Sequence, residues 1–232
     1  MEKKEQLKKV VAKEVLKYIE TDMVIGLGSG STMVYVIEEI GNAVKEGMIK
    51  RIYGVPTSFQ SEILGREHNI KILDFNTIEK IDLAIDGADE VDPKKHLIKG
   101  GGGAHAREKY IDYFAERFIV VVDESKLVQA LGQKFPVPVE VLPEAYRSVQ
   151  KKLSNLGAIS QLRMALKKAG PVITDQGNFI LDAKFTSLDQ PRQLEMNINN
   201  IPGVLENGIF TRTVECVLIG SYSDGKAKVI RI

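Results

Sequence analysis

The sequence predicts an α/β fold built on a doubly wound, mostly parallel sheet. Short apolar runs alternate with segments of helical spacing from Met23 to Val122. Several of these runs are apolar at every position, as expected for parallel strands that helices cover on both faces. Glycine-rich or acidic stretches follow some of the runs directly. Because ligands of such sheets bind beyond the carboxyl ends of the strands, we expect the functional residues there.

Composition and charge narrow the possible partners. The 232 residues are 44% hydrophobic and 27% charged, which is ordinary for a soluble globular protein with one large domain or a medium and a small one. Lys and Arg (32) nearly balance Asp and Glu (31), so the net charge is +1. A nearly neutral chain has no overall positive potential that would attract nucleic acid or an anionic membrane, and we expect neither as a partner.

The N-terminal lysines Lys3, Lys4, Lys8 and Lys9 alternate with glutamates, which is typical of a solvated helix face. No apolar run approaches the roughly 18 residues of a membrane span, so we expect a cytoplasmic protein. The single cysteine, Cys216, lies in an apolar run and is expected to pack as a small hydrophobe.

The first elements follow from spacing. Apolar residues recur at helical spacing over residues 3–20, and residues 23–27 form an apolar run bounded by turn residues, which predicts a helix and then a buried strand. Met33 to Gly47 resumes helical spacing. The alternation continues with strands at 51–55, 70–74, 81–86 and 118–122 and with helices at 58–67 and 104–115. Residues 87–98 are interpreted as an acidic, proline-containing connection.

The pattern changes after Lys126. Three prolines within residues 135–143 suit an edge strand or a domain crossing better than a central strand. A helix (144–156), a strand (158–165), a hairpin turn at Asp175 to Asn178 between strands 172–174 and 179–181, and a helix (191–200) follow. We therefore predict a small α+β domain at 131–205, inserted into a main domain of 1–130 and 206–232. Strands at 214–220 and 228–232 are expected to rejoin the first sheet.

The stretch Lys99 to Lys109 is the first candidate for a site. Four consecutive glycines, Gly100 to Gly103, let a ligand lie against main-chain N–H groups, and the helix that follows attracts anions at its start. Lys99 offers a cation before the loop, and Glu108 offers a carboxylate that can act as a base. The alternative is a flexible linker, but an apolar pair precedes the glycines and a helix follows them directly.

A second candidate is Gly28-Ser29-Gly30-Ser31-Thr32, which links the strand at 23–27 to the helix at 33–47. Backbone N–H groups and hydroxyls there can converge on one anion. The dinucleotide pattern is broken at Ser31, and no Gly-Lys-Ser/Thr follows as in nucleotide-binding P-loops. Because both nucleotide patterns are broken, the loop favours a phosphate monoester as its ligand. The alternative is that Ser31 or Thr32 only caps the helix.

Asp86-Gly87-Ala88-Asp89-Glu90-Val91-Asp92 places four carboxylates at a strand end. Carboxylates accept hydrogen bonds from sugar hydroxyls and can move protons to and from a ring oxygen. The alternative is a solvated turn. The order of residues does not match a calcium loop, the histidines show no metal-ligand spacing, and His105 is interpreted as a surface histidine at a helix start. We expect no metal. The Gly-x-Ser-x-Gly elbow of hydrolases is also incomplete.

Four motifs together closely resemble the ribose-5-phosphate isomerases of type A. They are Gly28 to Thr32, Asp86 to Glu90, Lys99 to Gly102 with Arg107-Glu108-Lys109, and Asp123 to Lys126, and their order and the chain length match. The resemblance implies a cofactor-free aldose–ketose isomerase of the pentose phosphate pathway, which interconverts ribose 5-phosphate and ribulose 5-phosphate. It also implies a Rossmann-like domain, a smaller α+β (ferredoxin-like) domain and assembly as a homodimer or homotetramer.

The resemblance also implies roles for individual residues. Glu108 would be the base that moves a proton between C2 and C1. Asp86, Asp89 and Lys99 would contact the sugar oxygens, and Asp86 would serve ring opening. The wider substrate-binding set comprises Ser29, Gly30, Ser31 and Thr32 with Lys126 at the phosphate end, and Gly87, Ala88, Gly100, Gly101 and Gly102 at the sugar. Locally, His105 and Ala106 replace a more usual apolar residue and Thr, and Gly103 replaces Ala.

Two other functions remain open from the residues alone. A sugar-phosphate-sensing regulatory domain would bind without turnover, although residues 1–22 are too short for a helix-turn-helix. A nicotinamide-dependent oxidoreductase is disfavoured because the dinucleotide fingerprint is broken.

Overall fold

The structure, a computed structural model, describes residues 2–232, which form two compact units. The first comprises the chain up to Gly87, Arg107–Lys126 and Thr213–Ile232, and the second comprises Ala88–Ala106 and Leu127–Arg212. The domain boundaries expected at 130/131 and 205/206 differ from these limits. The second unit also takes in residues 88–106, 127–130 and 206–212.

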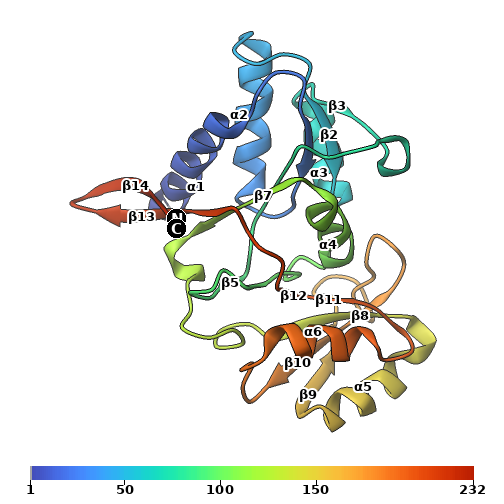
Figure 1. Ribbon diagram of the computed structural model, residues 1–232. Coiled ribbons are helices and arrows are strands. Elements are labelled where there is room, and N and C mark those ends of the chain that lie inside the picture. Colours follow the sequence, from blue (N-terminus) through green and yellow to red (C-terminus); the bar gives the residue numbers. More distant parts are fainter. Residues whose placement is uncertain (1) are drawn as a thin grey trace. The chain divides into compact units, whose positions relative to one another are not determined.

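The first unit is built from helices and mostly parallel strands (Figure 1). Its helices are α1 (Glu2–Val15), α2 (Met33–Lys45), α3 (Phe59–Glu67) and, from Arg107 on, α4 (His105–Phe114), with short 3-10 helices η1 (Leu16–Tyr18), η2 (Phe75–Thr77) and η3 (Glu124–Lys126). Its strands are β1 (Val24–Leu27), β2 (Tyr53–Pro56), β3 (Lys71–Ile72), β4 (Leu83–Asp86), β7 (Arg117–Asp123), β13 (Cys216–Ser223) and β14 (Lys226–Arg231).

These strands form one seven-stranded sheet in the order β14-β13-β7-β4-β1-β2-β3. All neighbours are parallel except β13 and β14. Ile25 and Leu27 face the core formed with α1 and α2, whereas a Cβ on Gly26 would meet Ile111 of α4. Helices therefore cover both faces, which confirms the doubly wound α/β prediction. The tail rejoins the first sheet as expected, with Cys216 opposite Ile119.

The predicted helices and strands of this unit are found within a few residues of their expected limits. The strand expected at 70–74 is reduced to Lys71–Ile72. Ser58 caps α3 through a reciprocal pair of hydrogen bonds with Ser61, which fixes where that helix begins.

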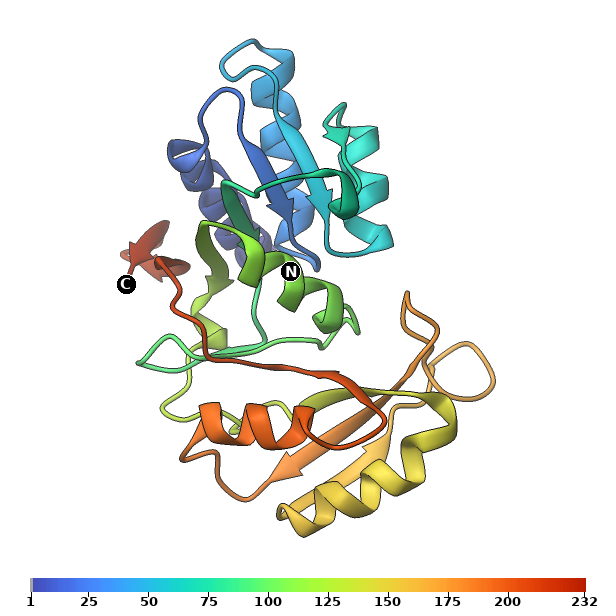
Figure 2. The same cartoon turned by 45° about the vertical axis from the view of Figure 1, so that its right-hand side comes forward.

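The second unit holds two small sheets together with helices (Figure 2). Its helices are α5 (Tyr146–Asn155), α6 (Pro191–Asn199) and the 3-10 helix η4 (Pro143–Ala145). Its strands are β5 (Glu90–Val91), β6 (Leu97–Ile98), β8 (Val137–Val141), β9 (Ala158–Leu162), β10 (Phe179–Phe185), β11 (Val204–Asn207) and β12 (Ile209–Phe210).

The larger of the two sheets is antiparallel, with the order β11-β8-β10-β9. The chain order β8-α5-β9-β10-α6-β11 makes it a ferredoxin-like βαββαβ arrangement. Val139 and Leu181 face the core that α5 and α6 complete through Val149 and Ile198. Residues at alternate positions, such as Ile180 and Asp182, lie on the face without helices.

The expectation of an edge strand in the proline-rich segment was wrong. β8 lies between β11 and β10, although it contains Pro138. The N–H of Gly208 donates to the Pro138 carbonyl at 2.8 Å, so the proline nitrogen faces the same side. β11 has already ended there at Asn207, so no partner strand requires the missing donor.

Two further parts differ from expectation. The connection 87–98 contains β5 and β6, which form a three-stranded antiparallel sheet with β12. Such two-residue strands are too short for a sequence period to show. The turn at 175–178 is present, since Gly177 N–H donates to the Thr174 carbonyl, but residues 172–174 form no strand.

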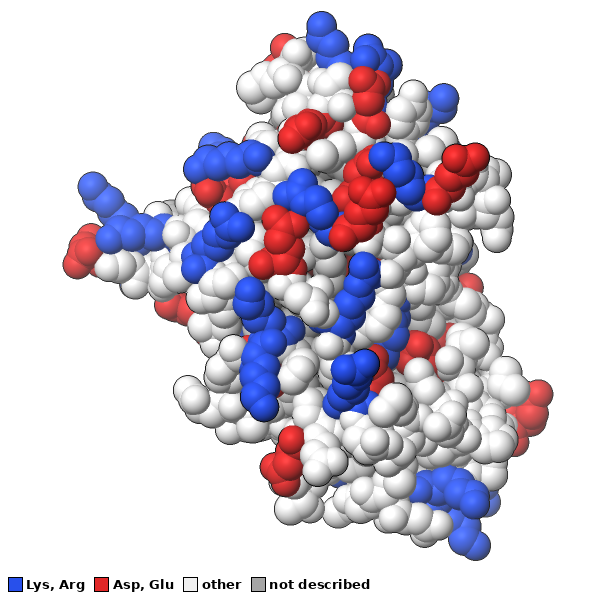
Figure 3. All heavy atoms as spheres, viewed as in Figure 1, with Lys and Arg blue, Asp and Glu red and all other residues white. Residues whose placement is uncertain are grey.

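Charged side chains of both signs are mixed over the face shown in Figure 3, in keeping with a net charge of +1. Across residues 2–232, none of the helices combines the length and the apolar character that crossing a membrane requires.

Glu140, in the middle of β8, is a buried carboxyl. Its Oε1 accepts hydrogen bonds from the Thr174 hydroxyl (2.7 Å) and the Asn178 amide (2.9 Å), and Oε2 has no hydrogen-bond partner within the described chain. Burial raises the pKa of this carboxyl above its ordinary value of 4.5, and the two donors oppose that rise. Glu140 thus ties the 174–178 turn to the sheet, and burial disfavours the charged form of its carboxyl.

Replacing Glu140 with Gln tests this effect of burial. A carboxyl whose pKa is raised by folding stabilises the fold below its unfolded-state pKa, and that contribution is lost as pH rises through the folded-state pKa. We therefore expect Glu140→Gln to gain stability relative to the parent chain as pH rises above 4.5. Urea unfolding at a series of pH values measures the difference. The exposed Glu144→Gln is the control, and a pH-independent difference for Glu140→Gln would contradict the expectation.

Candidate active site

The carboxyl ends of three neighbouring strands in the first unit carry the predicted motifs. Gly28 follows β1, Asp86 ends β4, and Asp123 ends β7, and these strands are adjacent in the order β7-β4-β1. Because the strands are parallel, all three residues lie at the same edge of the sheet. The fold thus gathers residues that lie far apart in the chain.

Asp86 is fully buried and fixes the loop that follows β1. Its Oδ1 accepts hydrogen bonds from the backbone N–H groups of Ser29 (2.9 Å) and Gly87 (2.7 Å). Gly28 lies against it: a Cβ there would be 2.2 Å from Asp86 Oδ1 and 2.6 Å from Asp86 Cα. The carboxylate and the glycine loop are therefore one packed unit.

The Ser29 hydroxyl belongs to a cluster of hydroxyls. It lies 2.7 Å from the Thr57 hydroxyl and donates to the Ser58 hydroxyl. Gly30 N–H donates to the side chain of Gln60 at 2.9 Å. Thr57, Ser58 and Gln60 were not predicted as site residues from the sequence. Their position after β2, at the same sheet edge, is the signal that could have found them.

Lys8 contacts the predicted phosphate loop. Its ammonium group donates to the Ser31 hydroxyl at 2.9 Å, although the lysines of this helix were interpreted as a solvated face. The bond is at an exposed position, in keeping with a solvated face, but helical spacing alone did not show that Lys8 contacts this loop. Thr32 precedes α2 but makes no capping hydrogen bond with its side chain, so the plain capping alternative fails for Thr32.

Glu108 lies in the first turn of α4 and is 5% exposed. Only Ala115 and Glu116 separate α4 from the start of β7, so the helix runs antiparallel to the strands and begins at their carboxyl ends. Ile111, three residues after Glu108 on the same helix face, packs against Gly26 of β1. The structure therefore places Glu108 at the sheet edge that carries Ser29 and Asp86.

Lys126 ends the short helix η3, directly after β7. Asp123, the last residue of β7, accepts hydrogen bonds from the backbone N–H and the hydroxyl of Ser125, which fixes this turn. Lys126 is half-buried at the same sheet edge.

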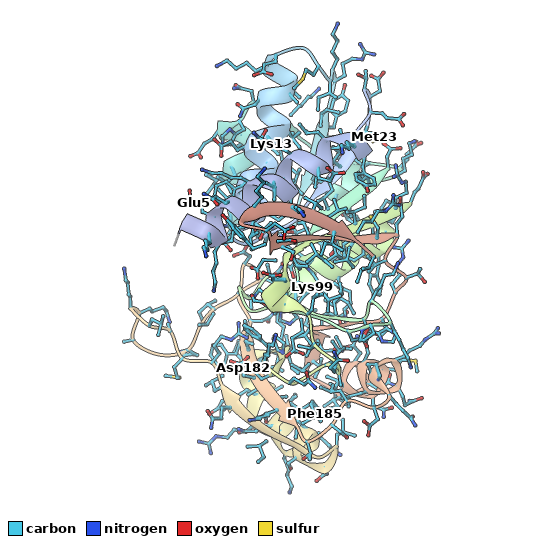
Figure 4. All side chains as sticks on the ribbon, turned by 90° about the vertical axis from the view of Figure 1, so that its left-hand side faces the viewer. Glu5, Lys13, Met23, Lys99, Asp182 and Phe185 are labelled. Carbon is cyan, nitrogen blue, oxygen red and sulfur yellow. The ribbon has the colours of Figure 1, made fainter. Side chains whose placement is uncertain are left out.

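In the second unit, Lys99 follows β6 and is 2% exposed. Its ammonium lies 5.5 Å from the centre of the Phe210 ring, and its backbone N–H donates to the Gly208 carbonyl at 2.9 Å. Lys99 is labelled in Figure 4. A lysine held so deeply has a fixed direction and little freedom to lose on binding.

The glycine loop is shaped by close neighbours. Gly100 has φ +98°, and a Cβ on it would be 2.7 Å from His105 Nδ1. Gly101 N–H donates to Asp89 Oδ2 at 2.7 Å, and a Cβ on Gly101 would strike the same carboxylate. Gly102 is exposed, and a Cβ there would meet nothing within 4 Å. Two of the glycines are thus required by close contact within the loop.

The other two acidic residues of the 86–92 turn have structural partners. Glu90 is fully buried and accepts backbone hydrogen bonds from Gly132 (2.6 Å), Lys134 and Phe135 (2.8 Å). Asp92 accepts from the backbone N–H groups of Lys94 and His96. The solvated-turn alternative is therefore wrong for Glu90.

His105 is buried, not a surface histidine as expected. The first residue of a helix is often exposed, but here the left-handed turn at Gly100 brings the loop back over the ring. Among residues 2–232 no three His, Cys, Asp or Glu side chains are grouped so that they could hold a metal ion.

Comparison with known proteins identifies the family of this chain. The family model of ribose 5-phosphate isomerase A (phosphoriboisomerase A) matches residues 53–224. Ribose-5-phosphate isomerase A of Thermosynechococcus vestitus is 52% identical over 98% of this chain and 96% of its own length. The chain belongs to the ribose 5-phosphate isomerase A family.

Solved structures of the family share the whole fold. A D-ribose-5-phosphate isomerase in complex with phospho-erythronic acid superposes with a TM-score of 0.93 at 51% identity, covering 98% of this chain and 99% of that one. The ribose 5-phosphate isomerase A of Methanocaldococcus jannaschii gives a TM-score of 0.91 at 48% identity, with 98% and 99% covered.

Within this family member, the predicted site residues fall into two groups. The first unit places Ser29, Asp86 and Glu108 at one sheet edge, together with the loop to Thr32 and with Lys126. The second unit holds Asp89 against Gly101 and Lys99 beside the glycine loop.

Gly28→Ala tests the packing of Gly28 against Asp86. The added methyl group must displace Asp86 or the loop, so we expect unfolding free energy to fall by about 1–3 kcal/mol and turnover to fall with it. Urea unfolding provides the measurement. Gly102→Ala is the matched control for stability, because its methyl group meets open space and should change stability by less than about 0.5 kcal/mol. Equal stability of the two variants would show that Asp86 does not require a glycine at position 28.

Proposed function

We propose that this chain interconverts D-ribose 5-phosphate and D-ribulose 5-phosphate through an enediolate, in the non-oxidative pentose phosphate pathway. Membership of the ribose 5-phosphate isomerase A family over nearly the whole chain carries this assignment. The non-catalytic sensor is not favoured, because relatives with this name match the full length rather than a single domain.

Glu108 is the proposed base that moves the proton between C2 and C1. A C–H bond beside a carbonyl is a weak acid, so its removal needs a carboxylate within hydrogen-bond reach. Glu108 is buried in the first turn of α4, a helix held to β1 by the contact between Ile111 and Gly26. Such packing supports the role because a rigid base loses little orientation freedom in the reaction.

Asp86 is proposed to serve ring opening, and Lys99 to stabilise the enediolate oxygen with the loop N–H groups. A buried cation and fixed N–H donors stabilise negative charge that develops in the transition state. The 2% exposure of Lys99 supports this role. Asp89 is proposed to contact sugar hydroxyls, as are Gly87, Ala88 and the loop Gly100 to Gly102.

The phosphate is proposed to lie at the start of α2, on Ser29 to Thr32, with Lys126 nearby. The N-terminus of a helix carries partial positive charge and N–H groups directed outward, both of which favour an anion. Lys8, which donates to the Ser31 hydroxyl, brings a further positive charge to this loop.

One solved relative is a complex with phospho-erythronic acid, a phosphorylated four-carbon acid. We propose that the same compound binds here in competition with the sugar phosphate. Assembly as a homodimer or homotetramer and a place in the cytoplasm also remain proposals from the family resemblance.

Glu108→Gln tests the role of the base. We expect turnover of ribose 5-phosphate to fall about a hundredfold or more, because an amide cannot accept the C2 proton. Binding of phospho-erythronic acid should persist, because Gln keeps the shape of the side chain. Ketose formation is followed in the presence of a chelator without added cofactor, and binding is followed by calorimetry.

The control is Glu38→Gln, a glutamate of α2 outside the candidate site, which should keep parental turnover. Near-normal turnover of Glu108→Gln would show that another group is the base. Binding without ketose formation by the parent chain would instead favour the sensor.

A further inference from the structure

Arg163, directly after β9, contacts the glycine loop from the four-stranded sheet. Its Nη1 donates to two backbone carbonyl oxygens, those of Gly100 (3.0 Å) and Gly101 (3.1 Å). The arginine side chain is only 17% exposed. The contacts of Arg163 were not expected from the sequence.

Asp182 of β10 holds the guanidinium in place. Its carboxylate accepts from Arg163 Nε at 2.9 Å and from Nη2, a bidentate pair that fixes the plane of the group. Asp182 lies on the sheet face without helices, next to Ile180, whose side chain would be 3.0 Å from a Cβ on Gly103. Figure 4 labels Asp182 on this strand, together with Phe185. The same sheet face thus supports the loop at two places.

These bonds fix two consecutive peptide planes. A trans peptide is planar, and its C=O and N–H point in opposite directions. The plane between Gly100 and Gly101 is held at both ends, with its oxygen on Arg163 and its N–H on Asp89. The next plane has its oxygen on Arg163, so the Gly102 N–H points away from the guanidinium.

Within the loop the Gly103 N–H also donates to the Gly100 carbonyl at 3.0 Å, and Arg163 adds a second bond to that carbonyl and a bond to the Gly101 carbonyl. Glycine populates positive and negative φ about equally, so a run of four glycines permits peptide rotations that other residues forbid. The freedom that lets a ligand approach the loop also means that the direction of the Gly102 N–H depends on what holds the neighbouring carbonyls. An external group that binds the carbonyls fixes that direction.

We propose that Arg163, held by Asp182, is a positioning residue that directs the Gly102 N–H toward the anionic oxygen of the reacting sugar and keeps Asp89 aligned through the Gly101 N–H. The inference rests on the proposed function. Arg163 itself does not touch the substrate and acts through the loop.

The test compares Arg163→Ala, Arg163→Lys and Asp182→Asn with the parent chain. An N–H donor that acts on the developing negative charge affects kcat more than KM. We expect Arg163→Ala to lower kcat for ribose 5-phosphate at least about tenfold, with KM changed less than about threefold. Arg163→Lys should recover part of the lost kcat, because the lysine can still donate to one loop carbonyl. The kcat of Asp182→Asn should lie between those of Arg163→Lys and the parent chain.

Chemical rescue separates positioning from folding. Arg163 and Asp182 line a hollow of about 570 Å³, so a free guanidinium ion can reach the space left by Arg163→Ala. Guanidinium far below unfolding concentrations should restore kcat in Arg163→Ala and leave Glu108→Gln and the parent unchanged. The matched control is Arg147→Ala, an arginine of α5 outside the candidate site, which should keep parental kcat and show no rescue.

Parental kcat in Arg163→Ala overturns the inference and leaves the proposed function intact. A loss that guanidinium does not restore, accompanied by a lower unfolding temperature, also overturns it, because the role is then structural. If Arg163→Ala does not fold, the Asp182→Asn variant provides the test. A parental kcat in Asp182→Asn overturns the inference, and a loss of kcat without a comparable change in KM supports it. If the parent chain forms no ketose, both the proposed function and this inference are wrong.

Discussion

The carboxylate of Asp86 is the constraint on which the first half of the candidate site depends. One oxygen accepts the N–H groups of Ser29 and Gly87, so a single buried side chain joins the end of β4 to the loop after β1. Only glycine at position 28 leaves room for that carboxylate. A buried acceptor of two backbone donors is costly to disturb, because the loop would lose its shape and leave polar groups unsatisfied.

The same principle recurs in the second unit with other partners. Asp89 accepts from the Gly101 N–H, Glu90 accepts from three backbone groups of residues 132–135, and Arg163 donates to two loop carbonyls. Each of these charged side chains fixes the conformation of a backbone segment whose own residues do not favour a single conformation. Loops that bind small molecules need such external order, because a mobile loop loses entropy on binding.

The sequence predicted the fold class, the alternation of elements and the sheet edge where the motifs gather, because hydrophobic period and glycine position are local properties. It did not predict β5, β6 and β12, whose two-residue strands carry no period. It was wrong about β8, because the tolerance of Pro138 depends on where a neighbouring strand ends. His105 was also misjudged, because the burial of one side chain depends on how the chain returns over it.

The sequence by itself determined which residue types could serve a phosphorylated sugar, since each glycine-rich or acidic motif is a short continuous stretch at the end of an expected strand. Tertiary structure alone decided what surrounds them. Lys8 reaches Ser31 across 23 positions, and Arg163 reaches Gly100 across 63. The physical reason is that a hydrogen bond between distant segments depends on the path of the backbone, and no local pattern of side chains encodes that path.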